Sequence, residues 1–237
     1  MLGKKKWRRS GAIRQEHRGS SHLRSSVSVL KASDDKDLSC ELFFYTENGM
    51  VKRSSFAEYN LSKSSFSAIG LKDGDSLIKV EKVMEDTTIF FGTQNGMCLY
   101  AETTDIPLQG RPAGGVKGMN IDSGDKVIGA FQSDGEGEIV VVTEQGVGKR
   151  VICATLDVSA RYRKGVKMSD PKLGKVLLYS YVKTPYEIGM VDSLGSVHGV
   201  YTEDIEIVED RTKKGKSVVK IKNIKLESAC VHYGKLD

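Results

Sequence analysis

Arg111-Pro-Ala-Gly-Gly115-Val-Lys117 decides how the chain is organised, because its pattern returns at a fixed interval. Fifty residues later the chain has Arg161-Tyr-Arg-Lys-Gly165-Val-Lys167, and after fifty more it has Arg211-Thr-Lys-Lys-Gly215-Lys-Ser217. Three evenly spaced arginines, each four residues before a glycine, are not expected by chance in 237 residues with 25 glycines. The spacing predicts an array of similar units.

A second repeated signal is a glycine turn between residues that favour β-strands. The clearest copy is Leu42–Arg53, where an Asn-Gly pair at Gly49 supplies the backbone angles of a tight hairpin. The turn glycine returns at Gly96, Gly146 and Gly195, at intervals of 47, 50 and 49 residues. Each unit therefore contains a hairpin, and we expect its apolar residues Phe43, Phe90 and Val141 to be core.

Each unit ends with another turn and an apolar strand, such as Asp122-Ser-Gly-Asp125 before Val127–Ala130. Four strands in a repeat of this size are typical of a propeller blade. We therefore predict a single all-β domain of about five blades, a partial one at 1–36 and complete ones at 39–83, 86–133, 137–182 and 186–232. The first blade lacks its opening strand, which predicts an open sheet edge or an unclosed ring unless another segment supplies the strand. We expect Met1 to mark a cut through a longer polypeptide.

Composition excludes some classes of protein. The chain has 39% hydrophobic and 28% charged residues, and no apolar run approaches the roughly 18 residues of a membrane-spanning helix. The cysteines and histidines are too scattered to predict a metal site, a disulfide pattern or a catalytic set, and we expect no cofactor. These residues are Cys40, Cys98, Cys153, Cys230, His17, His22, His198 and His232. We expect the cysteines to be small buried residues in a reducing cytosol.

The N-terminal part of the chain is strongly basic. Residues 1–31 contain nine Lys or Arg and one acid, Glu16, whereas the net charge of the whole chain is only +5. A basic, Ser-rich start is also typical of an organellar transit peptide, which stays an alternative. We favour the repeat, because its register accounts for the same residues.

The repeated loops are candidates for binding a polyanion. An Arg or Lys fixed at one place in every blade would form a charged arc around the rim of a propeller, which suits a curved nucleic acid. Arg can hold phosphate bidentately, Lys acts as a point charge, and the loop glycines would let backbone N–H groups approach the DNA strand. The net charge of the loop rises from +2 at Arg111–Lys117 to +4 at Arg161–Lys167 and +5 at Arg211–Lys220, so the C-terminal blades should bind hardest.

Nothing in the sequence resembles a recognition helix or a regular series of exposed aromatic residues. We therefore expect binding of duplex DNA through its backbone, without sequence specificity. The candidate DNA-binding residues are Arg14, Arg18, Lys63, Arg111, Lys117, Arg161, Arg163, Lys164, Lys167, Arg211, Lys213, Lys214 and Lys216.

The repeats resemble one known family. A single tryptophan, Trp7, does not fit WD repeats, and the paired glycines of kelch blades are missing. The Thr-x-x-Gly hairpin followed by a basic strand (46–53, 93–100 and 143–150) and the loop Gly110–Gly118 resemble the C-terminal domain of the A subunit of bacterial type IIA topoisomerases, the gyrase and topoisomerase IV family. That resemblance implies a β-pinwheel, whose blades exchange strands and whose basic rim bends DNA.

The resemblance also implies that this chain carries no active site. In the family the DNA-cleaving tyrosine lies in an upstream domain of the A subunit, and the ATPase is its partner, the B subunit. It implies a part of an ATP-dependent type II topoisomerase in the bacterial cytoplasm, associated with the nucleoid.

Gyrases carry a seven-residue box, Gln-Arg-Arg-Gly-Gly-Lys-Gly, and the aligned segment here is Gln15-Glu-His-Arg-Gly-Ser-Ser21. Glu16 replaces a cation, and Ser20 and Ser21 replace Lys and Gly. Because the box serves full DNA wrapping in the family, its departure favours a topoisomerase IV-like role over gyrase-type supercoiling.

Two other functions are compatible with a propeller. One is a protein-interaction platform that has lost DNA binding. The other is an enzyme with its site in the central channel, which we disfavour because no acid pair or histidine cluster recurs in the repeats.

Overall fold

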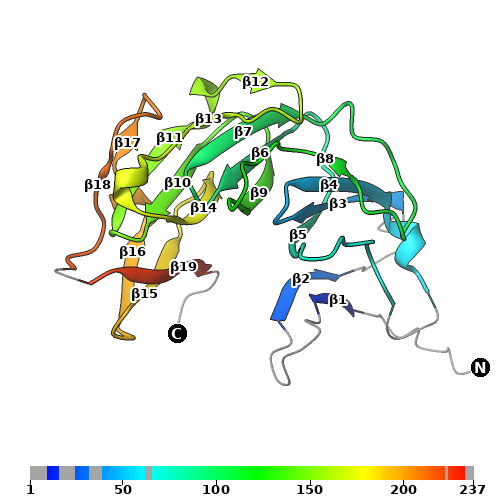
Figure 1. Cartoon of the computed structure of the whole chain (residues 1–237), viewed down its shortest axis with the longest axis horizontal. Helices are drawn as coiled ribbons and strands as arrows, with labels where there is room; N and C mark the ends of the chain where they lie inside the picture. The colour runs from blue at the N-terminus through cyan, green and yellow to red at the C-terminus, as the bar shows by residue number, and fades with distance from the viewer. Residues whose placement is uncertain (1–9, 16–24, 32–38, 62–65, 222–223, 233–237) are drawn as a thin grey trace, which may run out of the picture. The chain divides into compact units, whose positions relative to one another are not determined.

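The computed structural model describes residues 10–15, 25–31, 39–61, 66–221 and 224–232. These residues form an all-β structure with short 3-10 helices (Figure 1). The chain divides into two compact units, one of residues 1–84 and 105–116 and the other of residues 85–104 and 117–237. Among the described residues, no helix is long and apolar enough to cross a membrane.

The described residues of the first unit form two sheets and a short helix, η2. Strand β1 pairs with β2, and a four-stranded sheet has the order β5-β3-β4-β8. Its elements are β1 (Ser10–Gln15), β2 (Ser25–Lys31), β3 (Glu41–Thr46), β4 (Met50–Ser55), η2 (Phe56–Tyr59), β5 (Leu77–Lys82) and β8 (Val116–Lys117), which ends at the boundary of the unit. A small core of Leu42, Phe44, Ile69, Leu77 and Val80 covers one face of the sheet.

The second unit contains three sheets. Their orders are β12-β7-β6-β9 with β13 also on β7, β14-β10-β11-β17 with β18 also on β11, and β16-β15-β19. The strands are β6 (Thr88–Thr93), β7 (Met97–Glu102), β9 (Val127–Ser133), β10 (Glu138–Thr143), β11 (Val147–Ile152), β12 (Val158–Ser159), β13 (Val166–Lys167), β14 (Val176–Val182), β15 (Glu187–Asp192), β16 (Val197–Tyr201), β17 (Ile207–Val208), β18 (Lys216–Ser217) and β19 (Leu226–His232). Short helices lie at η3 (Cys153–Thr155), η4 (Pro171–Leu173) and η5 (Thr202–Asp204).

The predicted hairpins are confirmed. Gly49, Gly96, Gly146 and Gly195 all have positive φ, between 68° and 88°, as tight turns require. The closing strands β5, β9, β14 and β19 each pair antiparallel with the first strand of a hairpin. The predicted sheet unit therefore repeats along the chain, whereas the blade limits stay a prediction.

The outer strand of a sheet comes from a later part of the chain. Strands β12 and β13 follow the β10–β11 hairpin in sequence but pair with β7, parallel and antiparallel respectively. Strands β17 and β18 follow the β15–β16 hairpin and pair with β11 in the same two directions (Figure 1). This exchange confirms the pinwheel arrangement. Strand β16 has no partner on its outer side among the described residues, and Val197 on it is 77% exposed.

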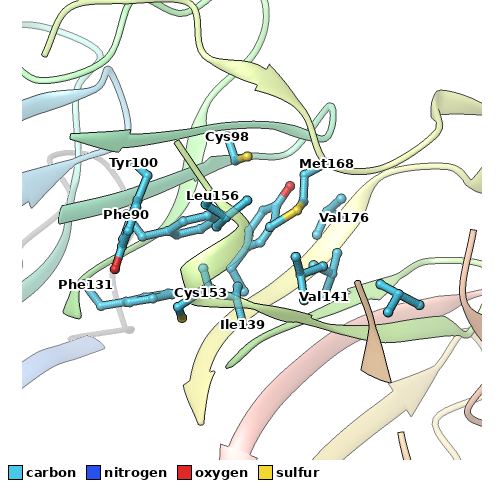
Figure 2. Close-up of a cluster of buried hydrophobic side chains, with 13 residues drawn as sticks. Phe90, Cys98, Tyr100, Phe131, Ile139, Val141, Cys153, Leu156, Met168 and Val176 are labelled. Atoms are coloured by element: carbon cyan, nitrogen blue, oxygen red, sulfur yellow. The ribbon is translucent and has the colours of Figure 1, made fainter. Parts of the chain in front are cut away.

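The main core of the second unit lies between its first two sheets (Figure 2). The rings of Phe90 and Phe131 stack at 4.9 Å between centroids, and Ile139, Val141 and Met168 belong to the same buried cluster. Phe43, Phe90 and Val141 are buried, as predicted. Met168 follows the exchanged strand β13 directly and is buried in this core. The core therefore helps to hold the exchanged segment in place.

The cysteines follow the prediction only in part. Cys98 and Cys153 are buried in this core, and burial raises the pKa of their thiols to about 12 and about 11, so they are poor nucleophiles. Cys40 is half-buried. The prediction is wrong for Cys230, which is exposed because it lies on the edge strand β19.

Candidate nucleic-acid interface

The repeated loops are shaped by strand exchange, and this explains their glycines. Gly165 has φ of 75°, and a Cβ at this position would overlap the carbonyl oxygen of Cys98 on β7. Gly215 approaches Gly148 on β11 in the same way, and at Gly115 a Cβ would lie 2.5 Å from the carbonyl oxygen of Val51 on β4. The loop glycine is therefore required for contact with the neighbouring strand of the protein, whereas its role in letting backbone N–H groups approach DNA stays a prediction.

The arginine that begins each loop makes protein contacts. Nη1 of Arg161 donates a hydrogen bond to the carbonyl oxygen of Lys117 at 3.0 Å, and Nη1 of Arg111 donates to the carbonyl oxygen of Ser67. The acceptor is 44 residues earlier in both cases, at the end of the preceding loop. Arg111, Arg161 and Arg211 are all half-buried. Arg111 and Arg161 therefore stabilise their loops, and the more accessible charge comes from the residues that follow them.

The later cations of the two C-terminal loops are all exposed. They are Arg163, Lys164 and Lys167 in one loop and Lys213, Lys214 and Lys216 in the other. Three of these lysines form solvent-accessible ion pairs. The distances from the lysine Nζ to a carboxylate oxygen are 2.6 Å for Lys164 and Asp122, 3.7 Å for Lys167 and Asp170, and 3.0 Å for Lys216 and Glu206. Such ion pairs contribute at most about 1 kcal/mol, so a phosphate can replace the carboxylate.

Lys117 is exposed and contacts Tyr162 in the second unit. Its Nζ donates to the hydroxyl of Tyr162 at 2.8 Å and lies 4.4 Å from the ring centroid, a cation–π distance. Tyr162 itself has φ of 61°, which is rare for a bulky residue, and its N–H donates to the carbonyl oxygen of Gly118 at 2.5 Å. The sequence did not single out Tyr162, because Pro112 and Thr212 stand at the matching positions.

The side chains of three predicted residues are not described. Arg18 and Lys63 are not described, and Arg14 lies in β1, where only the backbone is described. The degenerate box after Gln15 is also outside the described residues.

Two lysines that the sequence did not single out lie beneath the loops. Lys149 on β11 is 3% exposed, and its Nζ donates to the carbonyl oxygens of Arg211 and of Lys213, the latter at 2.7 Å. Lys52 on β4 is fully buried, and its Nζ donates to the carbonyl oxygen of Arg111 at 2.6 Å. Their signal in the sequence is a lysine three residues after the turn glycine.

Burial of Lys149 predicts a dependence of stability on pH. Burial lowers the pKa of Lys149 from 10.5 to about 8, while Cys98 and Asp210 raise it and Arg211 lowers it. Between these two values the unfolded chain binds more protons than the folded chain, so the cost of burying the ammonium is relieved as pH rises. We expect the free energy of unfolding of the wild type, minus that of Lys149→Met, to increase from about pH 8 to pH 10.5.

Urea unfolding of both proteins across this range measures the difference. The subtraction removes the titration of groups that the two chains share, such as the buried thiol of Cys153 and the buried phenol of Tyr179, whose pKa is raised by burial. A difference that does not change with pH would contradict a buried ammonium at Lys149.

Within the described residues, no group of three or more His, Cys, Asp or Glu side chains is placed to bind a metal ion.

Comparison with known proteins agrees with the repeat. The family described as "DNA gyrase C-terminal domain, beta-propeller" matches residues 41–84, 87–134 and 137–175. The DNA gyrase A subunit of Staphylococcus epidermidis is 34% identical over 179 residues, which are 72% of this chain and 20% of that protein. The DNA gyrase A subunit of Ureaplasma parvum is 28% identical over 186 residues, 77% of this chain and 22% of that protein. The chain thus spans about a fifth of the length of the curated relatives it matches.

Solved structures share the fold. The crystal structure of the C-terminal domain of DNA topoisomerase IV aligns with a TM-score of 0.80 and 23% identity, and covers 88% of this chain and 66% of that chain. The structure of the DNA gyrase A C-terminal domain aligns with a TM-score of 0.72 and 21% identity, and covers 91% of this chain and 73% of that chain. Repeat, strand exchange and family match agree, and the chain belongs to the DNA gyrase C-terminal domain family, the propeller-like C-terminal domains of the A subunits of type IIA topoisomerases.

Proposed function

We propose that this chain binds and bends duplex DNA, without sequence specificity, for an ATP-dependent type II topoisomerase. The observation that carries the proposal is the exposure of Arg163, Lys164 and Lys167 in one loop and of Lys213, Lys214 and Lys216 in the next. Exposed cations on successive loops, two of them at equal places in each loop, provide repeated contacts for the phosphates of one duplex. The chain itself performs no chemistry in this proposal. DNA cleavage belongs to an upstream domain, and ATP hydrolysis belongs to the B subunit.

The proposed binding is uneven along the chain. The loop 211–220 carries five cations, whereas the loop 111–117 carries two, of which Arg111 is held by protein. Contacts should therefore be strongest at the C-terminal loops, and a duplex that follows them would bend toward the protein because cations neutralise its phosphates on one side. Further proposed contacts come from Arg14, Arg18, Lys63 and Lys117.

We further propose that the enzyme relaxes or decatenates DNA as topoisomerase IV does. The support is the segment Gln15–Ser21, where Glu16, Ser20 and Ser21 replace residues of the gyrase box. A weaker cationic box would hold less DNA than full wrapping needs. Such an enzyme would act in the bacterial cytoplasm, in association with the nucleoid.

Duplex binding as a function of salt tests the proposal. Log affinity should fall linearly with log salt, by about 0.9 per phosphate contact, so on the order of five contacts give a slope of roughly −4.5. Fluorescence anisotropy of a labelled duplex, between about 50 and 200 mM salt, measures the slope. Two duplexes of unrelated sequence are the control and should bind equally. An affinity that does not depend on salt would contradict the proposal.

Bending has its own measurement. Energy transfer between dyes at the two ends of a short duplex should increase when the chain binds, because bending brings the ends together. Binding without a change in energy transfer would leave DNA binding supported and would reject bending.

A further inference from the structure

One position beneath the loops is lysine in two sheets and leucine in a third, and His198 stands at the corresponding place in the fourth hairpin. Lys52, Leu99 and Lys149 each stand three residues after a hairpin turn glycine, and they occupy the same place in the pairing of their hairpins, opposite Phe44, Phe91 and Val141. All three side chains are buried. Since Leu99 fills the position in one sheet, a sheet of this type forms without an ammonium there.

The two ammonium groups are held by loop carbonyl oxygens. Lys149 donates to Arg211 and Lys213, so it holds the backbone on both sides of the first exposed turn of its loop. Lys52 donates to Arg111 and, at 3.2 Å, to the carbonyl oxygen of Ala68, and thereby joins two segments of the first unit. Burying an ammonium is costly even when it is hydrogen-bonded. A buried lysine at this position therefore lowers the stability of the fold relative to a leucine. Its contribution is to fix the backbone of the loop through hydrogen bonds.

We propose that Lys149 and Lys52 are positioning residues that fix the backbone of the loop above them, so that its following cations lie outward for DNA, while the lysines themselves contact no DNA. The part that concerns DNA rests on the proposed function, whereas the part that concerns loop order does not. The loop 161–167, which lies on the strand of Leu99, is held without such an ammonium.

Burial separates this role from direct DNA contact. At 3% exposure the ammonium of Lys149 is covered by the loop, and its protons are directed to carbonyl oxygens of that loop. A phosphate oxygen would have to displace these carbonyl groups to reach Nζ. Lys213 and Lys214 are exposed beside it and carry the accessible charge.

Hydrogen exchange of the full chain tests loop order. In Lys149→Met, which keeps the length of the side chain but not its donors, the amides of residues 211–217 should exchange about tenfold faster, because two hydrogen bonds to a charged group are lost. The amides of residues 161–167 are the internal control and should not change. Unchanged exchange in 211–217, or equal acceleration in both segments, would overturn the proposal.

A second variant covers the case in which Lys149→Met does not fold. In Lys52→Met the amides of residues 111–115 should exchange about tenfold faster, while those of 161–167 and 211–217 keep their rates. Unchanged exchange in 111–115 would overturn the proposal for Lys52.

DNA affinity tests the positioning of the cations. Lys149→Met should weaken duplex binding by about fivefold. In the background Lys213→Gln/Lys214→Gln/Lys216→Gln the same change should have no further effect, because the exposed cations of the segment that it orders are gone. A loss that persists in this background would show that Lys149 contacts DNA, and would overturn the proposal. If the wild type binds no DNA, the proposed function fails, and hydrogen exchange alone decides loop order.

Discussion

Duplex DNA is expected to bind on the order of a thousandfold more weakly, at about 0.1 M salt, when Arg163, Lys164, Lys213 and Lys214 are all changed to Glu. Each lost phosphate contact removes about 0.9 from the salt slope, which corresponds to about eightfold in affinity at this salt concentration. These four residues are chosen because they are exposed, whereas Arg161 is half-buried and hydrogen-bonded to the preceding loop. Anisotropy titration with a labelled duplex measures the loss.

A matched pair separates the loops from net charge. Lys213→Glu/Lys214→Glu and Lys172→Glu/Lys175→Glu change the charge of the chain equally, and all four lysines are exposed. The loop pair should weaken binding about a hundredfold, whereas the control pair, in the turn before β14, should change it by less than about threefold. Equal losses for the two pairs would mean that only overall charge matters, and would reject the loops as the binding surface.

The second large effect is on stability. Gly165→Ala is expected to lower the free energy of unfolding by about 3 kcal/mol or more, because the added Cβ overlaps the carbonyl oxygen of Cys98 and the residue has a positive φ. The pairing of β13 with β7 would have to open to relieve the overlap. Urea unfolding gives the free energy, and the thermal midpoint should fall by about 2–4 °C per kcal/mol.

Gly124→Ala is the matched control. Gly124 has φ of 80°, close to the 75° of Gly165, but a Cβ there meets nothing within 4 Å. Its change to alanine therefore costs only the backbone strain, about 1–2 kcal/mol. The difference between the two variants measures the close approach of the exchanged strand. If both variants lose the same stability, the glycine of the loop is needed only for its backbone angle.

The repeat was predictable because its markers have strict physical requirements. Gly49, Gly96 and Gly146 have backbone angles that other residues rarely adopt, so the spacing of hairpins follows from the sequence. The apolar runs around Phe90 and Val141 had to be buried in any fold of this class. Fold class and sheet unit were therefore within reach of sequence analysis.

The spacing of the repeats alone could not predict which strand each exchanged strand pairs with. Strand β13 has only two residues, Val166 and Lys167, which is too short for an alternating pattern, and periodicity does not show which sheet edge it joins. The resemblance to a known family supplied that expectation. The roles within the loops were missed for a related reason, because the exposure of a cation depends on the strand beneath it.

Lys149 is the clearest example. In sequence it belongs to a basic strand and resembles a solvated cation, yet it is 3% exposed because a loop from a later repeat covers it. Tyr162 gave no signal either, since its left-handed backbone follows from the hydrogen bond of its N–H to Gly118.

Strand exchange also limits where this chain can be divided for experiments or by evolution. A cut after β14, at the end of one repeat, would separate β17 and β18 from the edge of β11 and would uncover the ammonium of Lys149. A cut after β18 would keep that edge covered but would leave the β15–β16 hairpin without β19. Neither cut leaves both the sequence repeats and the sheets intact. A shortened chain therefore needs another segment to pair with the exposed edge strand, whereas a duplicated repeat would supply the outer strands for the sheet that precedes it.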